Sequence, residues 1–100
     1  MRLVFLSASK QGVASDQGFA LVSVALEAFE YREANRVMRL EGERLYLPNG
    51  GFGFGFYPGW REARWQPPFE DVPISEADRD RIVENIKAAM AFMDLMVQFG

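Results

Sequence analysis

The side chains that could carry chemistry in this chain are carboxylates and arginines. Its 100 residues include no histidine and no cysteine, so the commonest general base, the commonest metal ligand and any thiolate nucleophile are missing. Acid–base catalysis by carboxylates needs a pair held in a cleft with well-separated pKa values. Glu70 and Asp71 are instead sequence neighbours shortly before Pro73, a pattern typical of a solvated loop. We therefore predict that the chain is not an enzyme.

Oxygen ligands for Mg²⁺ or Ca²⁺ are available in the same region, at Glu70, Asp71, Glu76 and Asp78. Their spacing matches no calcium-binding loop, and the last two are explained by the positive end of a helix dipole. The glycines between residues 50 and 55 also differ from a phosphate-binding loop, because they alternate with phenylalanine and no helix begins within about 20 residues. The sequence predicts neither a metal site nor a cofactor.

Tryptophan and arginine side chains could instead bind a macromolecular partner at the protein surface. Trp65 is expected to be buried, whereas Trp60 fits equally well a buried position and an exposed contact point beside Arg61. Arginines on a sheet face could bind single-stranded nucleic acid, with aromatic rings as stacking platforms. Acidic residues interleave with these arginines, which favours a mixed, solvated surface. The arginines are Arg32, Arg36, Arg39, Arg44, Arg61 and Arg64, and the interleaved acids are Glu33, Glu41, Glu43 and Glu62.

The charge is unevenly distributed along the chain. Residues 1–69 hold eight basic and seven acidic side chains, a balance of +1, whereas residues 70–100 hold three basic and seven acidic ones, a balance of −4; together they give the net charge of −3. An acidic sector disfavours phosphate backbones and favours basic partners. Nucleic acid is therefore not the expected partner.

A helix near the C-terminus is the element that must position most of these acids. Ser75 is its predicted N-cap and Asp78 completes a capping box. Apolar residues then recur with a period of 3.6, at Ile82, Ile86, Ala89, Met90, Met93 and Val97. After Ala88 the apolar surface widens. Either the end of the helix is covered on more than one side, or the chain turns back into a strand near Asp94.

Strand signals dominate the region before this helix. Residues 50–57 alternate glycine with phenylalanine, so Phe52, Phe54 and Phe56 share one face. Residues 36–40 and 44–47 alternate across Glu41-Gly42-Glu43, which predicts a tight hairpin, and residues 48–50 predict a second turn.

Two further segments complete the prediction of strands. Residues 19–31 fit a strand or a helix, and we favour the strand. Residues 1–6 are interpreted as a first strand, because their apolar run is too short for a signal peptide.

These elements predict a single α+β domain spanning residues 1–100. We expect an antiparallel, curved sheet of four to six strands, with one long C-terminal helix packed on it. The helix stripe and the three phenylalanines are the natural core partners. The apolar runs are too short for a membrane-spanning helix, so a cytoplasmic location is expected.

The chain from Arg39 onward resembles a family of small bacterial immunity proteins. The resemblance is carried by residues 40–45 (Leu-Glu-Gly-Glu-Arg-Leu), the Gly/Phe strand, residues 65–75 (Trp-Gln-Pro-Pro-Phe-Glu-Asp-Val-Pro-Ile-Ser) and residues 81–86 (Arg-Ile-Val-Glu-Asn-Ile). These proteins accompany polymorphic toxins, including those of contact-dependent growth inhibition. Where family members often have a histidine, this chain has Pro68 or Phe69, and residues 1–38 match no known pattern.

The resemblance implies a cytoplasmic protein that binds one cognate toxin domain, often a nuclease, and blocks it. An acidic patch would steer association with a basic nuclease and occupy the place of its substrate. The candidate contact residues are Trp60 as an anchor and the acids Glu70, Asp71, Glu76, Asp80 and Glu84.

Two other classes of function remain open from the sequence. One is a single-stranded nucleic-acid-binding module, because a sheet followed by a helix is similar to the Whirly architecture. The other is a self-associating domain, with the apolar tail 92–99 as the interface of a homo-oligomer.

Overall fold

The computed structural model describes residues 5–8 and 12–100 of the chain. Within these residues the strands are β1 (Phe5–Ala8), β2 (Gly12–Ser15), β3 (Phe19–Ala25), β4 (Ala28–Glu33), β5 (Arg36–Tyr46), β6 (Phe52–Phe56) and β7 (Met96–Phe99). The short 3-10 helix η1 (Pro58–Glu62) and the long helix α1 (Glu76–Phe92) lie between β6 and β7 along the chain. The strand expected over residues 1–6 falls partly outside the described residues, since β1 begins at Phe5.

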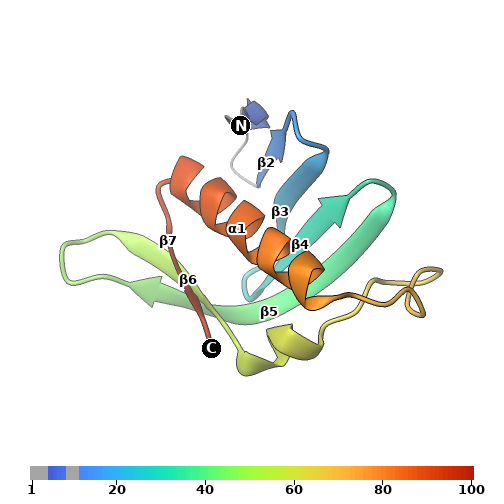
Figure 1. Ribbon diagram of the computed structural model, residues 1–100. Coiled ribbons are helices and arrows are strands. Elements are labelled where there is room, and N and C mark those ends of the chain that lie inside the picture. Colours follow the sequence, from blue (N-terminus) through green and yellow to red (C-terminus); the bar gives the residue numbers. More distant parts are fainter. Residues whose placement is uncertain (1–4, 9–11) are drawn as a thin grey trace.

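The described strands form one sheet in chain order, which curls around one face of α1 (Figure 1). Each consecutive pair from β1 to β6 is antiparallel. After α1 the chain turns back, as one of the two expectations had it, and β7 pairs parallel to β6. The predicted α+β class, the curved sheet and the C-terminal helix are thus confirmed. The six antiparallel strands agree with the expected number, and β7 adds a parallel edge.

Strand β5 corrects the predicted hairpin at residues 41–43, because the chain runs straight through this segment. Its first half pairs with β4 and its second half with β6. Gly42 is buried in mid-strand, and a Cβ atom there would lie only 2.1 Å from the carbonyl oxygen of Gly55. The glycine therefore permits close approach of β6 rather than a turn. The predicted turn at residues 48–50 does connect β5 to β6.

The ambiguous segment 19–31 is extended, as favoured, but it forms two strands rather than one. β3 and β4 make a hairpin in which Ala25 pairs with Ala28. The turn falls at Leu26 and Glu27, which are both exposed. Alternation along β3 and β4 places Leu21 and Tyr31 opposite each other and fully buried.

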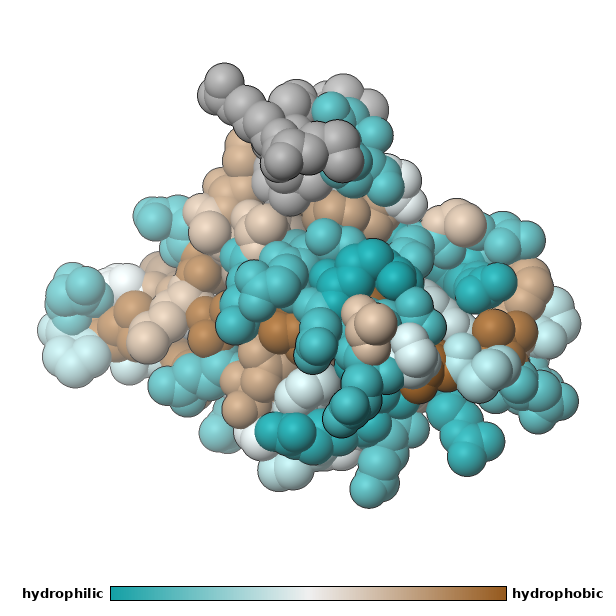
Figure 2. Space-filling model, viewed as in Figure 1, coloured by the Kyte–Doolittle hydropathy of each residue, from teal (hydrophilic) through white to brown (hydrophobic). Residues whose placement is uncertain are grey.

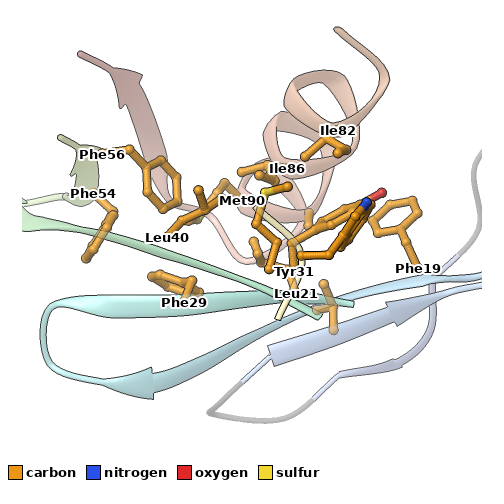
Figure 3. Close-up of a cluster of buried hydrophobic side chains, with 14 residues drawn as sticks. Phe19, Leu21, Phe29, Tyr31, Leu40, Phe54, Phe56, Ile82, Ile86 and Met90 are labelled. Atoms are coloured by element: carbon orange, nitrogen blue, oxygen red, sulfur yellow. The ribbon is translucent and has the colours of Figure 1, made fainter. Parts of the chain in front are cut away.

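The core fills the space between α1 and the concave face of the sheet (Figure 3). Its fully buried large side chains are Leu21, Tyr31, Met38, Ile86 and Met90. The predicted helix stripe supplies Ile82, Ile86, Ala89 and Met90. Burial of each large apolar side chain contributes about 1.5–3 kcal/mol. The helix and the sheet thus stabilise each other through this single cluster.

Only two of the three phenylalanines of β6 join that core. Phe54 and Phe56 are buried, and their rings lie in an edge-on contact with centroids 5.0 Å apart. Phe52 shares their face but remains 56% exposed, because it lies toward the tip of the β5–β6 hairpin, which projects past the helix (Figure 1). Trp65 is buried as predicted, and it forms a β-bridge with Met38.

Candidate partner-binding surface

The segment between β6 and α1 is irregular, and Arg79 of the helix holds its first part in place. The Arg79 guanidinium donates from Nη1 to the carbonyl oxygen of Trp60 at 3.1 Å and from Nη2 to that of Ala63 at 2.7 Å. Burial lowers the pKa of Arg79 from its ordinary value. The two carbonyls would otherwise lack these charge-assisted bonds, so Arg79 fixes η1 against the helix.

A second arginine anchors the middle of the same segment to the sheet. The Arg36 guanidinium carbon lies 5.9 Å from the ring centroid of Trp65 and 5.7 Å from that of Phe69. Both distances are within reach of cation–π attraction. The backbone N–H of Gln66 also donates to the carbonyl of Val37 at 2.7 Å. The segment is therefore tied to β5 as well as to α1.

The acids predicted to contact a partner begin on this anchored segment. Glu70 and Asp71 are exposed, and neither makes an ion pair within the described part of the chain. With Glu62 they line a hollow of about 410 Å³, whose other walls include Arg64 and Arg79. The hollow is a surface depression on the anchored segment, with charged side chains of both signs in its walls.

Helix α1 carries the other three acids that were predicted to contact a partner. Glu76, Asp80 and Glu84 are spaced by four residues, so they form one stripe on the face opposite the buried residues. Figure 2 shows hydrophilic side chains over the outward face of α1. Glu84 lies 3.5 Å from Lys87, and both side chains are more than half exposed. We call Glu70, Asp71, Glu76, Asp80 and Glu84 the acidic surface.

Trp60, the proposed anchor, is half-buried rather than free. Its indole Nε1 donates to the carbonyl oxygen of Gly100 at 2.8 Å, and its ring meets that of Phe99 edge-on with centroids 5.1 Å apart. The guanidinium of Arg61 lies 4.9 Å from the Trp60 ring centroid. Trp60 thus packs against the end of β7 and also carries the Arg61 guanidinium against its ring.

A polar network that the sequence analysis missed joins the helix to the sheet. The Tyr31 hydroxyl donates to Glu33 and accepts from Asn85 Nδ2 at 2.9 Å. Arg81 donates to Glu33 and to Asp78, each at 2.7 Å. Burial and the neighbouring Glu33 raise the pKa of Tyr31. The two bonds that join helix to sheet, Asn85 to Tyr31 and Arg81 to Glu33, link residues 54 and 48 positions apart, and no local pattern indicates such pairings.

The helix N-terminus follows the predicted capping box. The Ser75 hydroxyl accepts from the N–H of Asp78 at 3.0 Å, and the Asp78 carboxylate accepts from the N–H of Ser75 at 3.1 Å. Arg81 and the Ser75 contacts lower the pKa of Asp78. Asp78 is therefore a capping residue, while Glu76 and Asp80 are left on the surface.

The described residues show neither a metal-binding cluster nor a membrane-spanning helix. They contain no group of three or more acidic, histidine or cysteine side chains arranged to hold a metal ion. No helix among them is both long and apolar enough to cross a membrane.

Comparison with known proteins assigns a family. A family model described as immunity protein 74 matches residues 22–100. The chain belongs to the immunity protein 74 family. No curated protein and no solved structure matches the chain.

The family match confirms the resemblance to immunity proteins of toxin systems and extends it toward the N-terminus. The resemblance began at Arg39, whereas the match begins at Val22 and so includes most of β3 and all of β4. The matched range also contains the anchored segment and α1, so the whole acidic surface and Trp60 belong to the part of this immunity protein that its family shares.

Proposed function

We propose that this immunity protein neutralises a cognate toxin domain by binding it with the acidic surface. The observation that carries the proposal is the set of exposed carboxylates of the acidic surface, on a helix and on a segment that Arg79 ties to this helix by two hydrogen bonds. A rigid surface loses little conformational entropy on binding. Membership of the family supports a toxin as the partner.

The sign of the charge favours a nuclease as that toxin. A nuclease binds a polyanion and so presents a positive groove, which a negative protein surface can approach quickly and occupy. Glu70 and Asp71 would enter the positive groove, and the stripe on α1 would cover its rim. Trp60, beside Arg61, would supply the less polar part of the contact. The inhibitor works by occupation and performs no chemistry of its own.

The same proposal has consequences for where the protein acts and for the kind of toxin system to which it belongs. A nuclease acts on cytoplasmic nucleic acid, so its inhibitor would act in the cytoplasm. The toxin would be the variable C-terminal domain of a large secreted protein, as in contact-dependent growth inhibition.

Protection of cells tests this function directly. The cognate toxin domain is expressed from an inducible promoter, with or without the immunity protein. We expect growth arrest and nucleic acid degradation with the toxin alone, and normal growth with both proteins. Purified immunity protein should also abolish the nuclease activity at a stoichiometric ratio. Growth arrest that persists despite folded immunity protein would refute the proposal.

A further inference from the structure

Large apolar side chains are exposed near the C-terminal end of α1, away from the acidic surface. Tyr46 is 75% exposed, Phe52 is 56% exposed and Met96 is 46% exposed. Tyr46 and Phe52 are direct partners across the β5–β6 hairpin, and their ring centroids lie 5.7 Å apart. Figure 2 shows apolar side chains gathered on the side of this projecting hairpin. A contiguous apolar patch of this kind marks a protein interface.

A groove lies beside these two rings. It measures about 390 Å³ and runs between the hairpin and the turn that joins α1 to β7. Its apolar walls are Leu47, Phe52, Ala91, Leu95 and Met96. Asp94 stands on its rim with an exposed carboxylate. The patch therefore contains an exposed tyrosine ring, Tyr46, next to a groove that could receive such a ring. We call this patch, with Tyr46, Phe52, Met96 and the groove, the hairpin face.

Two charged side chains of opposite sign, Arg44 and Asp94, line the hollows of the hairpin face. Arg44 lies on the same strand face as Tyr46 and, with Phe52, lines a neighbouring hollow. Neither Arg44 nor Asp94 makes an ion pair in the described part of the chain. A basic toxin gains nothing from such a balanced face, whereas a two-fold interface requires one that complements itself.

We infer that two copies of this chain associate through their hairpin faces. A two-fold axis sets Tyr46 of each copy into the groove of the other, where its hydroxyl can donate to Asp94. Arg44 of one copy then faces the acidic rim of the other. The two acidic surfaces point away from each other, so each remains open.

Sedimentation velocity over a dilution series of roughly two orders of magnitude tests the inference. We expect wild-type protein to shift from monomer to dimer with concentration. Phe52→Glu places a charge at the centre of the interface, so it should weaken dimerisation roughly thirtyfold or more. Leu26→Glu is the matched control, because Leu26 is 72% exposed on the β3–β4 turn, and it should dimerise like wild type.

A second variant keeps the test independent of folding defects. Asp94 has a φ of 59°, which asparagine also tolerates, so Asp94→Asn removes only the charge. It should weaken the dimer, while the thermal unfolding curve of dilute, monomeric protein stays unchanged. Wild-type protein that stays monomeric throughout the series would overturn the inference. So would equal losses of dimer for Phe52→Glu and Leu26→Glu, or a monomeric wild type whose Phe52→Glu variant no longer binds the toxin. The last outcome would move the toxin contact to the hairpin face, whereas the first two leave protection by the acidic surface untouched.

Discussion

Arg36, Arg79 and Arg81 act as structural cations, each bridging two parts of the fold. Arg79 binds two carbonyls of the segment that follows β6, Arg36 lies against two aromatic rings of that segment, and Arg81 joins Glu33 to the helix cap. Of the six arginines considered as nucleic-acid contacts, Arg36 is thus engaged, and so are two more: Arg32 pairs with Glu30, and Arg61 lies over Trp60. The described surface therefore offers few free cations to a phosphate backbone.

Replacement of Arg79 tests its role as an anchor. Arg79→Ala leaves the carbonyls of Trp60 and Ala63 without their charged donor, so the free energy of unfolding should fall by about 1–3 kcal/mol. Urea denaturation followed by tryptophan fluorescence measures this loss. Arg64→Ala is the control, since Arg64 is exposed and its replacement should change stability by less than about 0.5 kcal/mol. Equal losses for the two variants would contradict the assignment.

Gly53 and Gly55 of β6 differ in how much room each leaves for a side chain. A Cβ atom at Gly53 would lie 2.8 Å from the carbonyl oxygen of Met96, which is backbone, whereas at Gly55 its nearest neighbour is a Leu45 methyl group 3.6 Å away. Gly53→Ala should therefore push β7 from β6 and cost about 1–3 kcal/mol. Gly55→Ala should be tolerated. Thermal unfolding of both variants decides the point, and a Gly53→Ala protein as stable as Gly55→Ala would refute the close packing of β7.

Among the elements, α1 carries both the core stripe and the acidic stripe, so its start must be well defined. The capping box supplies that definition, because it satisfies two backbone N–H groups that the helix leaves free. Ser75→Ala should lower the free energy of unfolding by about 1 kcal/mol, which corresponds to roughly 4–8 °C in the melting temperature of a domain of this size. Ser23→Ala is the control, since its hydroxyl makes only a 3.5 Å contact. An unchanged melting temperature for Ser75→Ala would show that the cap is dispensable.

The cap also predicts how stability depends on pH. Arg81, and then Ser75, lower the pKa of Asp78 below its ordinary value of 3.8. Its contribution to stability is therefore complete above pH 3.8, and it is lost as the pH falls through the lower pKa of the folded state. Asp78→Asn keeps an oxygen acceptor but does not titrate. The stability difference between wild type and this variant, measured by urea denaturation, should thus shrink on acidification; a constant difference would contradict the account.

The elements also show what the sequence could and could not predict. Local signals were sufficient for α1, because the capping box and the apolar stripe lie within one segment. They failed at Gly42, where a glycine between two acids resembles a turn but allows β6 to approach across a continuous β5. The distinction depends on a strand that follows later in the chain, which no local pattern contains.

At the scale of the whole molecule, the acidic surface lies around the start and the first half of α1, whereas the hairpin face lies at the C-terminal end of this helix. Sequence reasoning located the acids but could not show that Glu70 and Asp71 rest on a segment anchored by Arg36 and Arg79, since those contacts join distant residues. It assigned self-association to the tail 92–99. Leu95 and Met96 of that tail do line the groove of the hairpin face. The structure adds Tyr46 and Phe52 from the β5–β6 hairpin, while Phe99 packs inward against Phe56.

Binding to the toxin domain after charge reversal tests the central claim most directly. Purified cognate toxin domain is titrated calorimetrically with wild-type protein, with Glu70→Lys/Asp71→Lys, and with Glu41→Lys/Glu43→Lys. The control pair makes the same change in charge at exposed positions of β5. We predict that reversal on the acidic surface weakens binding by about a hundredfold or more and that the control changes it little. Equal affinities for all three folded proteins would contradict the claim.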